Sequence, residues 1–337
     1  EQKISFIVER VLGKGNLAPH KEISRIEISK ESIFVEGLEE NLIALDWVKN
    51  LGEGIFTLQG PLAKLSRIFD DLFFQLSLEM NARESTFPSL LSKDFLQIID
   101  YFSSFPQYTT YVSHLKPDLE TINNFINQQQ NNKSNIKISD TDFADFSMIL
   151  SPTVCYHAYD YLKNTKLDED NLLLTAKCNC YRWESKNMVH LKRLWEFQMR
   201  ELIFVGNPNF VLRKRQESLD RTLEICKLLG INAWVETAND SFFVSENSSK
   251  KRNYQKGMGM KWELRIPYNT QNDSVAAASF NFMQKTFGES CNIRLSDDSL
   301  AFTGCAGWGI ERWIYSFLAQ KGLEIDKWPE YIKNEMR

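Results

Sequence analysis

Charged and aromatic side chains alternate along two adjoining stretches of the sequence. TAKCNCYRWES is followed, after the short turn 185–192, by LKRLWEFQMREL, and we predict that the two stretches pair as antiparallel strands. Side chains two apart share a face, which groups Arg182 with Glu184 and Arg193 with Phe197 and Glu201. Guanidinium groups bind phosphate oxygens in pairs, a ring stacks on adenine, and a carboxylate accepts from its amino group. The pattern indicates a nucleotide site, although a solvated, salt-bridged face has the same spacing.

A second stretch, TGCAGWGIERW from Thr303 to Trp313, passes from a predicted strand through glycines into a helix. Glycines allow a ligand to approach the backbone. Arg312, in the first helical turn, adds positive charge to a helix start that already favours anions, which suits a terminal phosphate. By itself such a stretch is a weak signal.

Taken together, these stretches resemble the catalytic domain of class II aminoacyl-tRNA synthetases. The resemblance covers the chain from about Gly60 to its C-terminus, and it matches all three motifs of the class. Pro88 corresponds to the proline of motif 1, at a dimer interface, and Arg182-Trp183-Glu184 corresponds to the RxE of motif 2. The positions that correspond to motif 3 are Gly307, Gly309, Glu311 and Arg312.

Within the class, the chain is most similar to atypical seryl-tRNA synthetases and to the related amino acid:[carrier protein] ligases. The stretches that carry this likeness include TVCYHAY, RLWEFQMRELIFVG, ETANDSFF and ASFNFMQKTFG. The resemblance implies a Zn²⁺ ion bound by Cys155, Glu201 and Cys305, with an open position for the amino group of the substrate. Thiolates and a carboxylate are good zinc ligands, and a catalytic zinc keeps such a vacancy. Without the motifs, two distant cysteines would be ordinary core residues.

Other residues near the expected zinc and nucleotide sites are predicted to have supporting roles. We expect His157 on a strand face shared with Cys155, as a supporting pocket residue more than as a competing ligand. Cys178 and Cys180 are expected to pack beneath the nucleotide, since two thiols alone cannot complete a zinc shell. Asn281 is expected to bind the substrate, and Trp308 to favour a small side chain such as that of glycine, alanine or serine.

The expected chemistry is attack by the amino acid carboxylate on the α-phosphate of ATP, brought with Mg²⁺. Arg182 would stabilise the developing charge, and Arg312 would hold the γ-phosphate. The full set of expected ATP-binding residues is Arg182, Glu184, Arg193, Phe197, Glu263 and Arg312. One departure from the class concerns magnesium: Ser274 stands near the place where an acidic residue is usual.

The resemblance implies that the aminoacyl group then passes to the phosphopantetheine thiol of an acyl or peptidyl carrier protein. Seryl-tRNA synthetase-type charging of tRNA is the alternative, and a catalytically inactive paralogue used as a binding module is a third. A net charge of −4 makes tRNA an unlikely partner on this interpretation, because phosphate contacts need excess positive charge. We also expect a homodimer.

The elements that would position these residues predict an α+β fold, with an antiparallel sheet flanked by helices. Residues 1–54 are expected to form a small N-terminal appendage, and residues 55–337 the catalytic domain. Apolar residues at helical spacing from Leu62 to Met80 predict a long helix, and 209–229 predicts another. Strands are expected at 172–184, 193–205, 262–267 and 300–306, and the polar run 127–135 is expected to be a loop or a poorly ordered tip.

The composition argues against a membrane protein, a secreted protein and a disulfide-rich fold. The apolar run from Ile68 to Leu78 is broken by Asp70 and Asp71, so we expect no membrane span. The charged start shows no secretory signal, and six cysteines in 337 residues are too sparse for a disulfide framework. A cytoplasmic enzyme is the resulting expectation.

Overall fold

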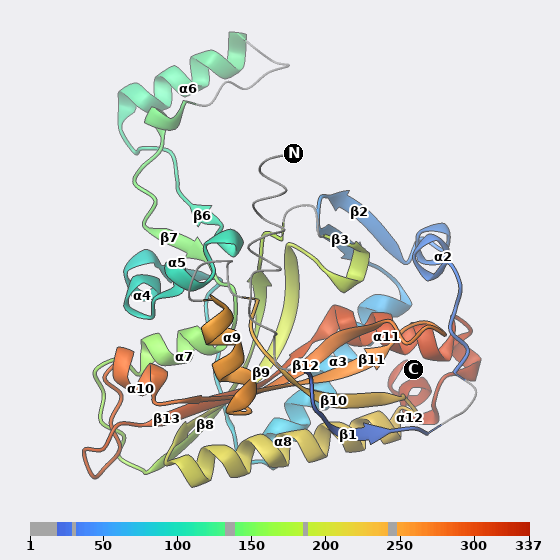
Figure 1. Ribbon diagram of the computed structural model, residues 1–337. Coiled ribbons are helices and arrows are strands. Elements are labelled where there is room, and N and C mark those ends of the chain that lie inside the picture. The colour runs from blue at the N-terminus through green and yellow to red at the C-terminus, as the bar shows by residue number, and fades with distance from the viewer. Residues whose placement is uncertain (1–18, 29–31, 132–138, 185–187, 242–247) are drawn as a thin grey trace.

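A twisted sheet of eight strands runs through the middle of the computed structural model (Figure 1). The structure describes residues 19–28, 32–131, 139–184, 188–241 and 248–337. Across the sheet the order is β1 (Glu22–Ile26), β10 (Ala233–Ala238), β11 (Lys261–Pro267), β12 (Ser274–Gln284), β13 (Phe302–Gly309), β9 (Glu196–Gly206), β8 (Asn171–Tyr181) and β4 (Arg83–Glu84). Neighbouring strands are antiparallel except β4 and β8, which are parallel. The predicted α+β class and antiparallel sheet are confirmed.

Three long helices pack on one face of the sheet: α3 (Pro61–Glu79), α8 (Pro208–Leu228) and α11 (Ile310–Lys321). Two of these helices, α3 and α8, start where the sequence favours it. Pro61 and Pro208 occupy first-turn positions whose N–H groups need no partner, and the Asn207 side chain accepts a hydrogen bond from the Phe210 N–H. The apolar stripe of α3 is buried, which confirms the predicted helix, and α8 confirms the one predicted at 209–229.

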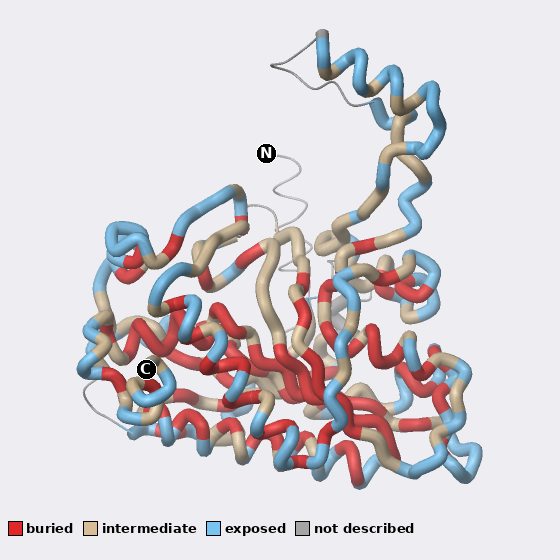
Figure 2. The backbone as a smooth tube through the Cα atoms, turned by 180° about the vertical axis from the view of Figure 1, so that it is seen from behind, coloured by how far each residue is buried: buried red, intermediate tan, exposed pale blue. Residues whose placement is uncertain are grey.

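Smaller elements lie over the opposite face and at the edges. They are α7 (Cys155–Tyr161), α9 (Ser248–Gly257), α10 (Thr286–Ser290), α4 (Lys93–Ile98), α5 (Tyr101–Ser104) and the three-stranded sheet β5 (Leu90–Ser92), β7 (Met148–Leu150) and β6 (Tyr111–Val112). Short 3-10 turns lie at η1 (Pro106–Tyr108), η2 (Asp140–Asp142), η4 (His190–Lys192) and η5 (Ile325–Lys327), and α12 (Glu330–Glu335) packs against α3. Figure 2 shows the buried strands between these layers.

An arm that ends in helix α6 (Leu119–Asn131) projects from the body (Figure 1). The polar run 127–135 was expected to be a loop, but its first part, 127–131, continues this helix. Glutamine and asparagine can follow an amphipathic stretch into a helix when no glycine or proline stops it. The rest of the run lies outside the described residues.

The N-terminal region joins the body more closely than the expected division at residue 54 implies. Strand β1 pairs with β10 at the edge of the large sheet, and helix α2 (Leu38–Ala44) buries Leu38 and Leu42 in the main core. The hairpin of β2 (Val48–Gly52) and β3 (Ile55–Leu58) spans the expected boundary. Gly54 lies in its turn and has a positive φ, which glycine adopts without strain. The sequence also contains a short β-like run at 4–9, and this run lies outside the described residues.

Within the described residues, no helix is long and apolar enough to cross a bilayer. The six cysteines are all free and buried.

Candidate active site and metal centre

A large cavity of about 1050 Å³ opens on the face of the sheet away from α8. Its floor consists of side chains from β9, β11, β12 and β13, and its walls come from α7, η1 and the segments around Arg182 and Lys192. Arg182, Glu184, Arg193, Phe197, Glu201, Glu263, Asn281, Cys155, Cys305 and Arg312 all line it. Of the predicted site residues, the structure therefore brings together all but Trp308.

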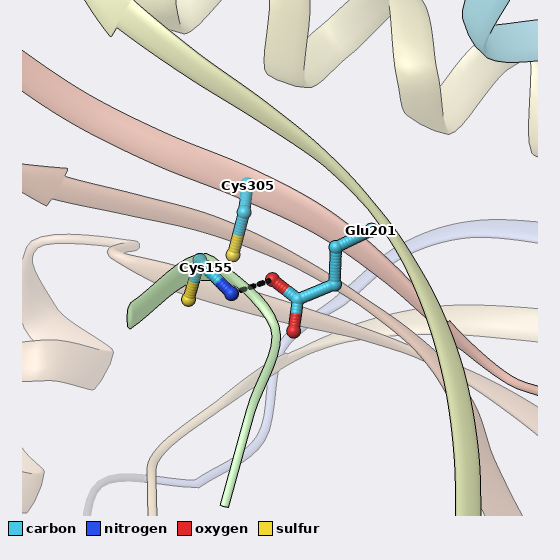
Figure 3. A group of neighbouring side chains, drawn as sticks. All are labelled: Cys155, Glu201 and Cys305. Atoms are coloured by element: carbon cyan, nitrogen blue, oxygen red, sulfur yellow. Dashed lines mark hydrogen bonds between the residues drawn. The ribbon is translucent and has the colours of Figure 1, made fainter. Parts of the chain in front are cut away.

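Cys155, Glu201 and Cys305 meet at one end of this cavity, although they are far apart in the sequence (Figure 3). Their candidate ligand atoms all lie within 4.8 Å of one another, and all three residues are buried. Cys305 comes from β13, Glu201 from the neighbouring strand β9, and Cys155 from the first position of α7. The hydrogen bond between the two thiols, burial and the nearby Glu201 carboxylate raise the pKa of Cys155 well above its ordinary value.

The Glu201 carboxylate is held in place by the start of α7. One oxygen accepts a 2.6 Å hydrogen bond from the Thr153 hydroxyl and a 3.2 Å bond from the Val154 N–H, and the other accepts from the Cys155 N–H at 3.2 Å. Such bonds fix the orientation of a metal-binding carboxylate. Thr153 was not predicted from the sequence, and only its place two residues before Cys155 hinted at this role.

The donor set fits Zn²⁺. Two sulfurs and one carboxylate, on three separate elements, match a three-ligand site with a position left for substrate. Asn281, opposite Cys305 in the strand register, directs its amide nitrogen to the Cys305 sulfur at 3.3 Å. Its side-chain oxygen is buried and has no hydrogen-bond partner in the described part of the chain, so this acceptor is available to a ligand.

His157 lies apart from this group, and the expectation of a shared strand face with Cys155 is wrong. Both residues are on helix α7, where positions two apart point in nearly opposite directions. The His157 ring stacks on Phe87 at 5.6 Å, and burial lowers its pKa to about 4. Cys178 and Cys180 pack with Val154, Ala176 and neighbouring side chains in a small apolar cluster. That this cluster lies beneath a bound nucleotide stays a prediction.

The predicted nucleotide-binding residues surround the other half of the cavity. The Arg182 guanidinium lies 5.3 Å from the Phe197 ring centroid and donates to the Pro152 carbonyl at 2.9 Å. Arg193 pairs with Glu184 at 3.0 Å. Arg182, Glu184 and Arg193 lie just beyond the ends of β8 and β9 instead of within strands, yet the hairpin still gathers them with Phe197 on one side.

Arg312 enters the cavity from the start of α11. Its guanidinium is anchored by the Lys192 carbonyl at 2.8 Å and the Ala276 carbonyl at 2.9 Å, and burial lowers its pKa. The backbone N–H of Gln198 donates to both carboxylate oxygens of the neighbouring Glu311, each at 3.0 Å. Burial raises the pKa of Glu311 to about 7 despite these bonds.

Trp308 does not line the cavity, which corrects its expected role in substrate binding. On β13 the residues alternate between faces, so Gly307 faces the cavity and Trp308 faces the helices. The Trp308 indole stacks on Phe73 at 5.1 Å and donates to the Thr222 hydroxyl on α8 at 3.0 Å. Trp308 is a core residue, and it does not limit the size of a ligand directly.

Sequence reasoning also missed Lys261, Asp240 and Arg265, which line the cavity. Lys261 bonds to Asp240 at 2.8 Å and lies 3.2 Å from Glu263. Arg265 donates to the Ser274 hydroxyl at 3.1 Å and to the Ser274 carbonyl at 2.9 Å. Ser274 is the residue near the place where the class usually has an acidic side chain. For Lys261 and Arg265 the signal was present in the alternation of KWELR, whose first, third and fifth residues share a face.

No family model matches the chain, but individual proteins do. The type-2 serine–tRNA ligase of Methanococcus maripaludis is 28% identical over the whole chain, and that of Methanocaldococcus jannaschii is 25% identical over 95% of it. The chain is a homologue of type-2 serine–tRNA ligases. It spans 66% of the length of the first relative and 63% of the second.

Solved structures agree on the fold. The seryl-tRNA synthetase of Methanopyrus kandleri, in a complex with A. aeolicus tRNASec, superposes with a TM-score of 0.85 and 20% identity. The match covers all of this chain and 70% of that one. A prolyl-tRNA synthetase from Cryptosporidium parvum gives a TM-score of 0.65 at 14% identity, over 88% of this chain and 54% of that one. The class II synthetase fold is confirmed.

These relatives correct two predictions. The prediction of a carrier-protein acceptor is wrong, because the relatives are named as serine–tRNA ligases. The sequence stretches that suggested a carrier protein belong to the catalytic core, and the core residues do not distinguish one acceptor from another. The prediction that tRNA is an unlikely partner is wrong as well, since the closely superposing synthetase is bound to tRNA. The net charge of a whole chain says little about local contacts to phosphates.

Proposed function

We propose that this protein activates an amino acid, serine in the first instance, as an aminoacyl-adenylate and transfers it to tRNA. The observation that carries the proposal is the position of the buried Cys155, Glu201 and Cys305 group beside Arg182 and Arg312 in one cavity. The kinship with type-2 serine–tRNA ligases supplies the substrate class. An adenylate-forming ligase needs a place for an amino group, a place for a nucleotide, and positive charge between them.

Zinc is the ion that the two thiols and the carboxylate would hold, and it would supply a Lewis acid that selects an unprotonated amino group. Thr153 and the backbone at the start of α7 keep Glu201 oriented toward that position. Asn281 offers its unpaired side-chain oxygen to the bound amino acid. The amino acid is thereby held with its carboxylate directed to the nucleotide half of the cavity.

The nucleotide half would bind ATP as its Mg²⁺ complex. Phe197 provides a ring face for adenine, and Glu184 an acceptor for its amino group, while Arg193 keeps Glu184 in place. Arg182 stabilises the charge that develops as the carboxylate oxygen attacks the α-phosphate and pyrophosphate leaves. Arg312, fixed by two carbonyl groups, holds the γ-phosphate, and Glu263 is the carboxylate that we assign to the metal ion.

Transfer would then move the aminoacyl group from the adenylate to a tRNA 3′ hydroxyl, with release of AMP. The cytoplasm is the location that goes with this substrate, and a homodimer remains our prediction for the assembly. An inactive paralogue is less consistent with these side chains, since every predicted phosphate-binding residue is retained in the cavity.

Exchange of labelled pyrophosphate into ATP tests the first step. We expect exchange that depends on serine and Mg²⁺ and that is lost when a chelator removes zinc and restored when zinc returns. Charging of tRNA with labelled serine tests the second step. Exchange without charging of any tRNA would exclude the tRNA acceptor, and the absence of exchange with every amino acid would refute the whole proposal.

A further inference from the structure

The removal of Trp308 from the cavity leaves open what meets the side chain of the bound amino acid. The strand register locates the relevant wall. Cys305 on β13 lies opposite Asn281 on β12, and Asn281 lies opposite Lys261 on β11. Directly opposite residues in antiparallel strands point to the same face, so a row leads from the metal ligand through Asn281 to the Lys261 ammonium.

Lys261 is the end of a fixed ion pair. Its Nζ donates to one oxygen of Asp240 at 2.8 Å, and the other oxygen of Asp240 accepts from the Gln255 amide at 2.9 Å. Gln255 also accepts from the Asp240 backbone N–H at 2.9 Å, so Asp240 is bound on both sides. The pair is largely shielded, with side-chain exposures of 16% for Lys261 and 24% for Asp240.

The charges of the pair are maintained in spite of burial. Burial would lower the pKa of Lys261, but the Asp240 and Glu263 carboxylates raise it overall. Burial would raise the pKa of Asp240, but Lys261 and the bonds from Lys261 and Gln255 lower it overall. Arg182 contributes to both shifts, which places the pair within electrostatic reach of the residue that would meet the α-phosphate.

One donor of Lys261 is left for a ligand. An ammonium group has three N–H donors; one donates to Asp240 at 2.8 Å, and the Glu263 carboxylate lies 3.2 Å away as an ion-pair partner. Even with a second donor assigned to Glu263, a third is left. A hydroxyl oxygen can accept the third. An aliphatic side chain in the same place would keep water away from this N–H donor and offer no acceptor, so the donor would be buried without a hydrogen bond.

We propose that the Lys261–Asp240 pair is the specificity-determining wall of the amino acid subsite, which accepts a hydroxymethyl side chain and rejects an aliphatic one of similar size. The inference rests on the proposed function. It adds residues to that function that neither the predicted site nor the motifs contained.

The test compares serine with 2-aminobutyrate, in which a methyl group replaces the hydroxyl, by pyrophosphate exchange with the zinc-loaded protein. The wild type should prefer serine by about 100-fold or more, as sites do that hydrogen-bond a substrate hydroxyl. The paired variant Lys261→Met with Asp240→Asn keeps the volume and removes both charges. We expect it to reduce the preference at least tenfold, mainly through a lower kcat/KM for serine.

A matched control removes another ion pair of the same kind. Arg221 and Glu79 pair at 2.7 Å between α8 and α3, on the opposite face of the sheet. The variant Arg221→Met with Glu79→Gln should leave the preference unchanged. A preference in the Lys261 and Asp240 variant within twofold of the wild type would overturn the proposal.

If that variant does not fold, Lys261→Arg provides the decision, because it keeps the charge and enlarges the group. It should impair exchange with serine at least tenfold more than exchange with glycine, which has no side chain to meet the wall. Equal losses for both would reject the proposal. If the wild type ignores serine but activates another amino acid, the serine assignment fails first, and the same comparison with glycine then decides the role of the wall.

Discussion

The two faces of the central sheet are made from the same strands but differ in what they leave unsatisfied. On the face toward α3 and α8, Trp308 is fully buried and its indole N–H is bonded. One residue earlier on the same strand, Gly307 forms part of the cavity floor. On β9, Arg200 faces α3 and is bonded to Asp70 at 2.6 Å and 3.1 Å, whereas Glu201 faces the cavity.

The comparison shows that a buried charge is not by itself a sign of function. Arg200, Asp70 and Lys177 form a charged group on the packed face, and their contacts to one another satisfy them. On the cavity face, the Asn281 oxygen, the third donor of Lys261 and the sulfur pair keep capacity for a ligand. Spare bonding capacity next to open volume is what distinguishes the candidate site.

The largest effect should follow from removing a metal ligand on the cavity face. Cys155→Ala, Glu201→Ala or Cys305→Ala should each lose zinc and amino acid activation together, by more than the roughly 100-fold that changes around a metal site cost. Metal content by atomic spectroscopy and pyrophosphate exchange measure the two losses. Cys178→Ala, which alters a packing thiol, should keep both, and full zinc and activity in a ligand variant would remove that residue from the site.

Trp308→Ala tests the packed face. Loss of a fully buried indole, its stacking on Phe73 and its bond to Thr222 should lower the free energy of unfolding by about 3–5 kcal/mol. Denaturant unfolding measures this. The folded fraction should keep its preference among amino acids, and a changed preference at unchanged stability would return Trp308 to the substrate site.

Arg182→Ala should act on the reaction and leave stability nearly unchanged. Removing a group that stabilises the transition state costs about 10²–10³-fold in rate, so exchange should fall by that factor. A fall of less than about tenfold, or 1.4 kcal/mol, would show that Arg182 does not meet the reacting phosphate. Arg25, exposed on β1 and paired with Glu22, offers the control substitution Arg25→Ala.

The smallest expected effect is the pH dependence from Glu311, which lines the cavity from the first turn of α11. Its folded-state pKa is raised by burial from 4.5 to about 7, so the folded protein binds this proton more tightly than the unfolded chain. Its contribution to stability is present below pH 4.5 and is lost as the pH rises through about 7, by an amount of order 1–3 kcal/mol. Denaturant unfolding midpoints measured against pH should fall less steeply between about pH 4.5 and 7 in the Glu311→Gln variant than in the wild type. An unchanged slope would contradict the raised pKa of Glu311.

Some features of this protein follow from local sequence. The apolar stripe from Leu62 to Leu76 determines helix α3, because residues three and four apart share a helix face. The alternation along β9 and β13 determines which side chains share a face, and the motif residues identify the class of active site. Spacing within a single element is enough for these conclusions.

Other features depended on how distant elements pack. Only the tertiary structure brings Cys155 on α7 to Cys305 on β13 and shows that His157 turns away from them. The tertiary structure also decided which face of β13 meets the helices. For that reason Trp308 packs against the helices, and Gly307 borders the cavity. Alternation separates two faces but does not say which one is covered, because that depends on the helices that pack there, and these come from other parts of the chain.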